Sequence, residues 1–157
     1  MQNIALIQSC WHKEIVDQFG IAFQEQIQSN DQSNSKSEAQ TKQIDVFEAP
    51  GVVEIPLLSK LCAKKKIDDK PYYSAIVVAG LIVDHGVYRH EFVAQTVMDA
   101  IMKVQMDNEI PIIYGILTAQ DFMSDGRNAF FFDHFSVKGR EAANACLLTL
   151  SNIERFA

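Results

Sequence analysis

Four short segments rich in apolar residues are spaced along the chain, and polar or mixed segments separate them. They cover residues 3–9, 44–49, 73–83 and 110–118. The segment at 73–83, "YSAIVVAGLIV", contains an almost unbroken apolar run. Such a run is typical of a strand that is buried on both faces of a parallel sheet. We therefore predict four strands that form one sheet covered on both sides.

The segments between these strands carry the apolar spacing of helices. In residues 12–27 an apolar side chain recurs at every fourth position, and residues 90–108 carry a broad apolar stripe. A third helix is predicted over 54–66, where a run of lysines suits the negative end of the helix dipole, and a fourth over 138–153. Residues 119–135 are interpreted as a short helix followed by an irregular segment.

The predicted order is β-α-β-α-β-α-β-α-α. This alternation calls for a parallel sheet with right-handed crossovers and helices on both faces. We interpret all of 1–157 as a single α/β domain, with a polar, Ser-rich loop at 29–43. In such folds ligands bind beyond the carboxyl ends of the strands, so the residues that follow each strand are candidate site residues.

The composition narrows the class of protein. A formal net charge of −6 gives no broad attraction for nucleic acid or for an anionic membrane. No apolar stretch reaches the roughly 20 residues that span a bilayer, and the first residues lack the basic start of a signal peptide. Cys10, Cys62 and Cys146 are far apart and odd in number, which disfavours a disulfide framework. We expect three reduced thiols in a cytoplasmic protein.

Two strand ends carry residues suited to binding a small molecule. Trp11, the only tryptophan, follows the first strand, where its ring either joins the core or stacks on a flat heteroaromatic ligand. Pro50 and Gly51 end the second strand, and Glu54 follows in the first turn of the next helix. A carboxylate there suits the helix dipole by itself, while the free N–H groups of that turn can hold ligand oxygens.

The stretch "GLIVDHGVYRHEF" at 80–92 is dense in ionisable groups directly after the third strand. Gly86 lets the backbone approach a bound group closely, and Arg89 beside the next helix N-terminus would complete a phosphate pocket. A solvated helix cap is the alternative interpretation. The chain has no Walker A or GxGxxG motif, and its histidines lack HExxH or CxxC context. We therefore predict no nucleoside triphosphate or dinucleotide site and no metal.

Five segments, in order along nearly the whole chain, resemble those of lumazine synthases. "ALIQSCWHKEIVD" is similar to the family's first strand, "APGVVEIP" to its VPGAFEIP-type turn, and "GLIVDHGVYRHEFV" to its GxxIRGxTxHxxYV segment. "PIIYGILT" resembles the PVxFGVLT strand, and "KGREAANACLLT" resembles the NKGxEAAxAAxEM helix. "VYRHEFVAQ" together with "EAANAC" looks closest to the second, decamer-forming type of the family.

The resemblance implies a flavodoxin-like three-layer sandwich with a central four-stranded parallel sheet and helices on both faces. It implies condensation of 5-amino-6-(D-ribitylamino)uracil with 3,4-dihydroxy-2-butanone 4-phosphate to 6,7-dimethyl-8-ribityllumazine, phosphate and water, without a cofactor. Sites would lie between adjacent subunits of a pentamer, and two pentamers would pair into a decamer. The implied partners are these small-molecule substrates and further copies of the chain.

The resemblance also implies roles by position. Trp11 would stack on the uracil ring, and Tyr114 would come from the adjacent subunit. The other residues that would line the pyrimidine and ribityl sites are Val52, Val53, Glu54, Leu81, Ile82 and Val83. The implied phosphate-binding residues are Gly86, Val87, Arg127 and Lys138.

The chain departs from the family pattern where that pattern has an acid–base histidine, because Arg89 occupies this position. An arginine stays protonated, so we expect Arg89 to hold phosphate and stabilise negative charge while substrate phosphate, water or a histidine moves protons. His90 is the second catalytic candidate because histidine titrates near neutral pH. In a helix its side chain would point about 100° away from that of Arg89.

A second departure follows the fourth strand, where the register is broken in residues 124–137. Arg127 is the candidate phosphate ligand there, and Asn128 is the alternative. The run Phe130–Phe132 is an alternative subunit contact.

Two functions of other classes are compatible with the same sequence. One is a flavin- or lumazine-binding carrier without catalysis, and the other is an assembly scaffold whose pocket is vestigial.

Overall fold

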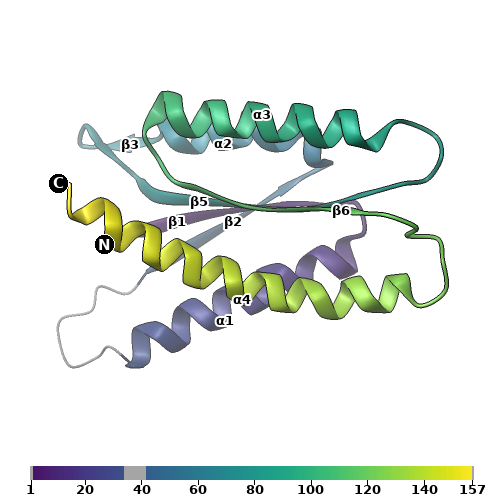
Figure 1. Cartoon of the computed structure of the whole chain (residues 1–157). Helices are drawn as coiled ribbons and strands as arrows, with labels where there is room; N and C mark the ends of the chain where they lie inside the picture. The colour runs from purple at the N-terminus through teal and green to yellow at the C-terminus, as the bar shows by residue number, and fades with distance from the viewer. Residues whose placement is uncertain (1, 34–41, 157) are drawn as a thin grey trace.

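The computed structural model describes residues 2–33 and 42–156. In chain order its elements are β1 (Asn3–Ser9), α1 (Lys13–Ser33), β2 (Gln43–Ala49), the 3-10 turn η1 (Val52–Glu54), α2 (Ile55–Lys64), β3 (Lys66–Ile67), β4 (Lys70–Pro71), β5 (Tyr73–Val83), α3 (His90–Asn108), β6 (Ile112–Ala119) and α4 (Arg127–Glu154). They form three layers, with α2 and α3 on one face of the sheet and α1 and α4 on the other (Figure 1).

The central sheet has four parallel strands in the order β2-β1-β5-β6. Leu6 in β1 pairs with Val46 on one side and with Val77 on the other, so β1 and β5 are the inner strands. All carboxyl ends therefore meet at one edge, the right-hand end of the molecule in Figure 1. The predicted α/β fold with a four-stranded parallel sheet is confirmed.

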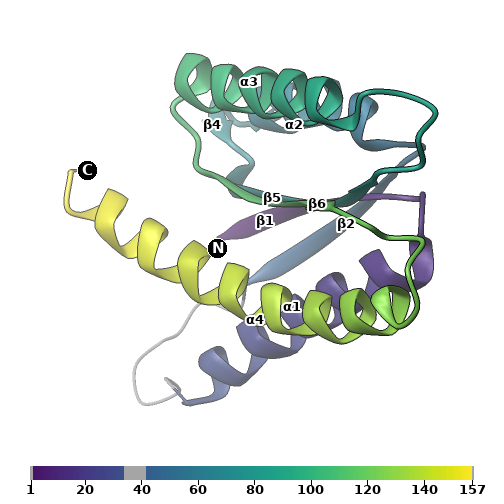
Figure 2. The same cartoon turned by 45° about the vertical axis from the view of Figure 1, so that its right-hand side comes forward.

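Each face of the sheet supplies one apolar core, because alternate side chains of a strand point to opposite faces. Ile4 and Leu6 of β1 belong to the core under α1 and α4, whereas Ala5 and Ile7 belong to the core under α2 and α3. In the turned view (Figure 2) the two helix pairs lie on opposite sides of the sheet. The sheet therefore separates two independently packed helix layers.

The prediction of a loop over 29–43 was wrong at its start, because α1 continues to Ser33. The polar residues there are satisfied within the helix, since the Ser29 hydroxyl donates to the Glu25 carbonyl at 2.9 Å. Asp31 accepts hydrogen bonds from both the backbone N–H (3.2 Å) and the ammonium group (2.6 Å) of Lys42. Residues 34–41 of the predicted loop lie outside the described residues.

The predicted helix over 54–66 ends two residues early, because Lys65 is already extended. A small antiparallel hairpin of β3 and β4 follows. Its turn residues Asp68 and Asp69 have φ values of 51° and 61°, and aspartate tolerates this left-handed region better than most residues.

Residues 119–135 do not form the predicted short helix and irregular segment. The chain turns after β6 and then forms α4 as one helix of 28 residues from Arg127. Phe131 and Phe135 are buried against the α1 layer, while Phe130 and Phe132 remain exposed. Phe131 and Phe135 are four positions apart, as expected for one face of a helix. The run of three consecutive phenylalanines obscures this spacing in the sequence.

Candidate active site

An apolar pocket of about 250 Å³ lies at the carboxyl edge of the sheet. Its lining comes from five separate places in the chain and consists of Trp11, Gly51, Val52, Val53, Glu54, Leu81, Ile82, Tyr88 and Val93. Six of these residues were predicted to bind the pyrimidine and its side chain. The structure therefore brings together Trp11, the turn after β2 and the end of β5, as the strand-end rule predicts.

Trp11 stands in the turn between β1 and α1, where its side chain is 62% exposed. The interpretation of this tryptophan as a core residue is therefore wrong. Cys10 N–H donates to the Ala49 carbonyl at 2.8 Å and ties the start of the turn to β2. His12, at the end of the turn, has a left-handed φ of 52°. An exposed indole that also lines an apolar pocket is placed to stack on a flat ring.

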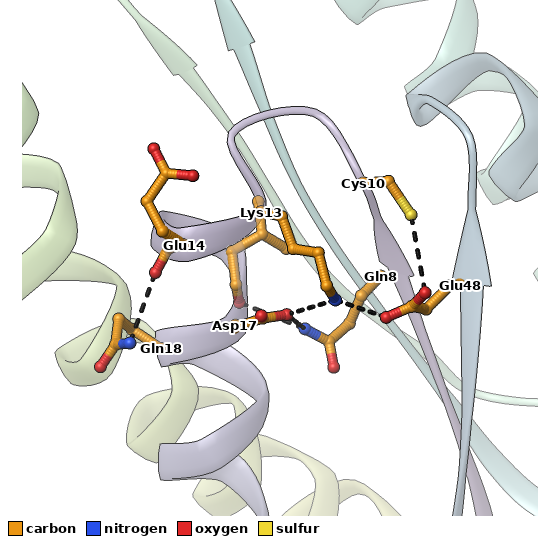
Figure 3. Close-up of polar contacts among 8 residues, drawn as sticks. Gln8, Cys10, Lys13, Glu14, Asp17, Gln18 and Glu48 are labelled. Carbon is orange, nitrogen blue, oxygen red and sulfur yellow. Dashed lines mark hydrogen bonds and ion pairs between the residues drawn. The ribbon is translucent and has the colours of Figure 1, made fainter.

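A polar network fixes this turn to the neighbouring strand (Figure 3). The Lys13 ammonium group bonds both the Asp17 carboxylate, at 3.1 Å, and the carboxylate of Glu48 near the end of β2. The Cys10 thiol also points to Glu48, with Sγ 3.9 Å from Oε2. These hydrogen bonds raise the pKa of Lys13 and lower the pKa of Glu48.

The turn after β2 forms the next wall of the pocket. Gly51 precedes η1, and its N–H donates to the Glu54 carboxylate at 2.9 Å. Val53 is 62% exposed, and Pro56 stands within the first two positions of α2, where the missing N–H costs no hydrogen bond. One Glu54 oxygen thus accepts a hydrogen bond within the turn, a role separate from the favourable helix-dipole position predicted for this residue.

The floor of the pocket depends on a close contact between β5 and η1. A Cβ on Gly80 would lie 2.6 Å from Val52 Cγ1 and 2.9 Å from the Ser9 hydroxyl oxygen. Only a residue without a side chain leaves room for Val52 here. Leu81 and Ile82 follow directly and line the pocket, whereas the predicted Val83 is 2% exposed and lies outside the lining.

Residues 84–89 form the exposed turn between β5 and α3. Gly86 has a φ of 68°, and its N–H donates to the Asp84 carboxylate at 3.0 Å. Val87 is 84% exposed. Tyr88 turns back, so that its ring lines the pocket and its hydroxyl lies 3.5 Å from the Val83 carbonyl.

Arg89 and His90 do not share a helical turn. Arg89 is the extended N-cap of α3, with φ −80° and ψ 91°, and its guanidinium carbon lies 6.0 Å from the Phe92 ring centre. His90 is the first helical residue and is buried, with Nδ1 3.5 Å from the Glu91 carboxylate. The premise of the expected 100° relation does not hold, because Arg89 lies outside the helix.

A second hollow of about 320 Å³ lies between α3 and the outer strand β6. His90 and Tyr114 both line it, together with Thr118 and Gln120. Burial raises the pKa of the Tyr114 phenol. Within one chain these two predicted site residues thus belong to a different hollow from Trp11.

Arg127 and Lys138 are separated along α4. Eleven residues of helix place their backbone positions about 16 Å apart, and each side chain has partners of its own. The Arg127 guanidinium packs 4.9 Å from the Phe131 ring centre and donates to the Gln120 carbonyl at 3.2 Å. Lys138 pairs with Glu141 at 2.7 Å.

Three residues that line this pocket were not among the predicted substrate-binding residues. They are Gly51, Tyr88 and Val93. Gly51 and Tyr88 lie inside the two motifs already singled out, so their place in the chain was a usable signal. Val93 was assigned only to the apolar stripe of its helix, and its position one turn into α3 gives no separate signal.

Neither a metal centre nor a membrane span emerges from the part of the chain that the structure describes. In residues 2–33 and 42–156 no three His, Cys, Asp or Glu side chains gather closely enough to hold a metal ion. Within the same residues, no helix combines the length and apolar character needed to cross a membrane.

The fold and the pocket define a parallel α/β domain with an apolar pocket at the carboxyl edge of its sheet. The family profile described as 6,7-dimethyl-8-ribityllumazine synthase matches residues 1–154. The chain belongs to this enzyme family, whose members are transferases.

Individual relatives match over almost the full length. "6,7-Dimethyl-8-ribityllumazine synthase 2" of Bradyrhizobium diazoefficiens is 42% identical over 99% of this chain and 86% of its own length. The protein of the same name from Pseudomonas syringae pv. tomato is 43% identical over 97% of this chain and 83% of its own. A 6,7-dimethyl-8-ribityllumazine synthase of Rhodococcus erythropolis is 38% identical over 98% and 92%.

Proposed function

We propose that this protein catalyses the condensation of 5-amino-6-(D-ribitylamino)uracil with 3,4-dihydroxy-2-butanone 4-phosphate to 6,7-dimethyl-8-ribityllumazine, a step of riboflavin biosynthesis. The observation that carries the proposal is the pocket in which Trp11 faces the turn at 51–54. It joins the family's motifs at the edge of the sheet where this fold binds ligands. The reaction needs no metal or cofactor, because an amine and a ketone condense once they are held together.

In this proposal the pyrimidine lies against Trp11, and the backbone of the turn at Val52–Glu54 holds the ring and the ribityl chain. Leu81 and Ile82 run along the pyrimidine edge, with Val83 beneath them. Apolar walls exclude water, which strengthens the hydrogen bonds that orient the amine.

The phosphate group would lie at the turn that contains Gly86 and Val87. This turn directly precedes the N-terminus of α3, where the positive end of the helix dipole favours an anion. Arg89 caps this helix, and its fixed positive charge would bind phosphate and stabilise charge as it leaves. It cannot donate and accept protons at neutral pH.

We further propose that a neighbouring copy completes each site. The pocket of one chain holds about 250 Å³, slightly below the roughly 300–1,000 Å³ of typical ligand sites. Tyr114 and His90 line the separate hollow beside β6, so they would reach a pocket only from an adjacent subunit. Arg127 and Lys138 would likewise contribute to phosphate binding across the interface, in a pentamer that pairs into a decamer.

A cytoplasmic location completes the proposal. The three cysteines are free thiols, which suits a reducing compartment.

A turnover assay tests the proposed reaction. Both substrates are mixed with purified protein, and the absorbance of the lumazine product is followed for the wild type, Arg89→Ala and the control Arg140→Ala. Arg140 is an exposed arginine on α4 and lines neither hollow described above. We expect product from the wild type and the control, and a loss of about 100-fold or more in Arg89→Ala. Full activity of Arg89→Ala would refute its role.

The same preparation separates the other functions, and light scattering measures its assembly. Tight riboflavin binding without turnover would favour a carrier. An intact oligomer that binds neither substrate would favour a scaffold.

A further inference from the structure

One aromatic side chain of the turn between β5 and α3 is directed to the pocket that Trp11 lines. Among residues 84–89, all of which the structure describes, Tyr88 alone lines this pocket. The other ring of the turn, that of His85, stacks instead on the ring of His12, with 6.0 Å between their centres. Tyr88 is therefore the side chain through which this turn contributes to the pocket.

The hydroxyl group of Tyr88 shows how its ring is held. It lies 3.5 Å from the carbonyl oxygen of Val83, the last residue of β5. The ring thus extends from the turn back to the end of the strand, and it lines the pocket together with Leu81 and Ile82 of that strand. A hydrogen bond of this length is weak, so we expect the contacts of the ring to matter more than the hydroxyl group.

Two aromatic residues from separate parts of the chain therefore belong to one pocket. Trp11 follows β1, and Tyr88 follows β5, which is the neighbouring strand in the sheet. Both side chains keep exposed surface, which a bound ring can cover. Apart from the turn at 51–54, the rest of the lining is aliphatic and consists of Leu81, Ile82 and Val93. Trp11 and Tyr88 are thus the two lining side chains that offer a flat π surface.

We propose that Tyr88 is a specificity-determining residue, which binds the pyrimidine substrate through the face or edge of its ring. The inference rests on the proposed synthase function for the identity of this ligand. Offset-stacked and edge-to-face contacts favour a flat, unsaturated ring over an open chain. The four-carbon ketone phosphate has no ring, so it gains nothing from Tyr88. The residue therefore acts on one of the two substrates only.

This role predicts a selective effect on one Michaelis constant. A contact that is equally strong in the ground state and in the transition state changes KM and leaves kcat unaltered. A purely structural role would have a different signature. Tyr88 directly precedes Arg89, the proposed phosphate ligand, so a turn that collapsed would displace Arg89. Such a collapse would change kcat and the KM of the ketone phosphate as well.

Steady-state kinetics of the full-length protein test the proposal with Tyr88→Leu, Tyr88→Phe and the control Tyr72→Leu. Leucine keeps apolar volume but removes the flat ring, whereas phenylalanine keeps the ring and removes the hydroxyl group. Tyr72 packs under the Lys65 ammonium group at 3.8 Å and lies outside the pocket lining. We expect Tyr88→Leu to raise the KM of the pyrimidine roughly three- to tenfold, while kcat and the KM of the ketone phosphate stay within about twofold. Tyr88→Phe and Tyr72→Leu should resemble the wild type in every constant.

Titration with riboflavin, which joins a flat ring to a ribityl chain, measures ring binding without turnover. Tyr88→Leu should weaken this binding by a similar factor, and Tyr72→Leu should not. Thermal unfolding of each variant establishes that it is folded, and Tyr88→Met, which also lacks a flat ring, replaces Tyr88→Leu if the latter does not fold.

Three outcomes would overturn the proposal. In the first, folded Tyr88→Leu keeps the KM of the pyrimidine within about twofold of the wild type. In the second, the KM values of both substrates rise together, and in the third Tyr88→Phe loses as much as Tyr88→Leu. A wild type that makes no lumazine would refute the proposed function instead. The riboflavin titration would then decide the role of the ring, since weaker binding by Tyr88→Leu supports it and unchanged or absent binding overturns it.

Discussion

The ammonium group of Lys13 bonds the carboxylate of Glu48 and thereby joins the start of α1 to the end of β2. These two elements flank the turns that carry Trp11 and Val52. Both charged side chains are largely exposed, at 48% and 57%, so solvent screens their attraction. The ion pair therefore has more effect on the relative position of two pocket walls than on stability.

We expect Lys13→Met to leave the urea midpoint of unfolding almost unchanged and to weaken riboflavin binding roughly two- to fivefold. Riboflavin titration of Lys13→Met and of Glu48→Gln checks this, since each variant breaks the same ion pair. Lys103→Met is the control, because Lys103 pairs with Asp107 on α3 in the same exposed manner. Equal weakening in the control would contradict the positioning role.

Trp11 provides its own optical signal, because it is the only tryptophan. A ring stacked on the indole should quench its fluorescence, and Trp11→Ala should weaken binding of the pyrimidine substrate about tenfold through lost stacking and burial. Isothermal titration compares Trp11→Ala, Trp11→Phe and the control Ile67→Ala, whose exposed side chain lies on the distant β3–β4 hairpin. Binding that is unchanged in Trp11→Ala would remove this residue from the site.

Gly80→Ala should damage the pocket and the fold together. The added methyl group would clash with Val52 and Ser9, and we expect a loss of about 1–3 kcal/mol in the free energy of unfolding. Val52→Ala removes one of the two clashing groups, so the double variant should recover part of this loss. Urea unfolding of the two single variants and the double variant measures the coupling, and strictly additive losses would argue against the contact.

The three thiols should react at very different rates. Burial raises the pKa of Cys146 to about 12 and also raises the pKa of Cys62. Cys10 is only partly buried and lies beside Trp11. Brief treatment with N-ethylmaleimide followed by peptide mass spectrometry should therefore find Cys10 modified first, and more slowly when riboflavin is bound. Rapid modification of Cys146 in folded protein would contradict its burial.

Acid should destabilise the protein partly through His12. Its pKa is lowered in the folded state, so below the unfolded value of about 6.5 the unfolded chain binds the proton more readily. The contribution of His12 to stability is thus complete above that pH and decreases as pH falls through the folded pKa. Urea unfolding at about pH 8 and about pH 5.5 should show a smaller acid loss for His12→Gln than for the wild type.

The regular elements were predictable wherever one periodicity dominated. The limits of β5 and α3 agree with the sequence expectation, because the first is apolar throughout and the second has an uninterrupted stripe. The start of α4 was not predictable in the same way. Its Phe130–Phe132 run contains both buried and exposed rings, and a helix boundary in such a run depends on packing against α1.

The sequence identified the strand ends that carry candidate site residues. It did not show which of these residues line the same hollow. Trp11 and Glu54 line one pocket, whereas Tyr114 lines another, and a sequence motif contains no information on which face of α3 a strand end will meet. The contact of His12 with His85 was also hidden, because it joins turns 73 positions apart in the chain. Each turn alone looks like an ordinary polar connection.

All residues that line the Trp11 pocket fall between positions 11 and 93, although the chain continues for another 64. The later β6 and α4 lie beyond the inner strands or on the opposite helix layer (Figure 2). The lining of this pocket and the elements β6 and α4 are thereby encoded in separate stretches of the gene. Mutation and selection can alter one stretch while the other is kept, and a laboratory library can follow the same division.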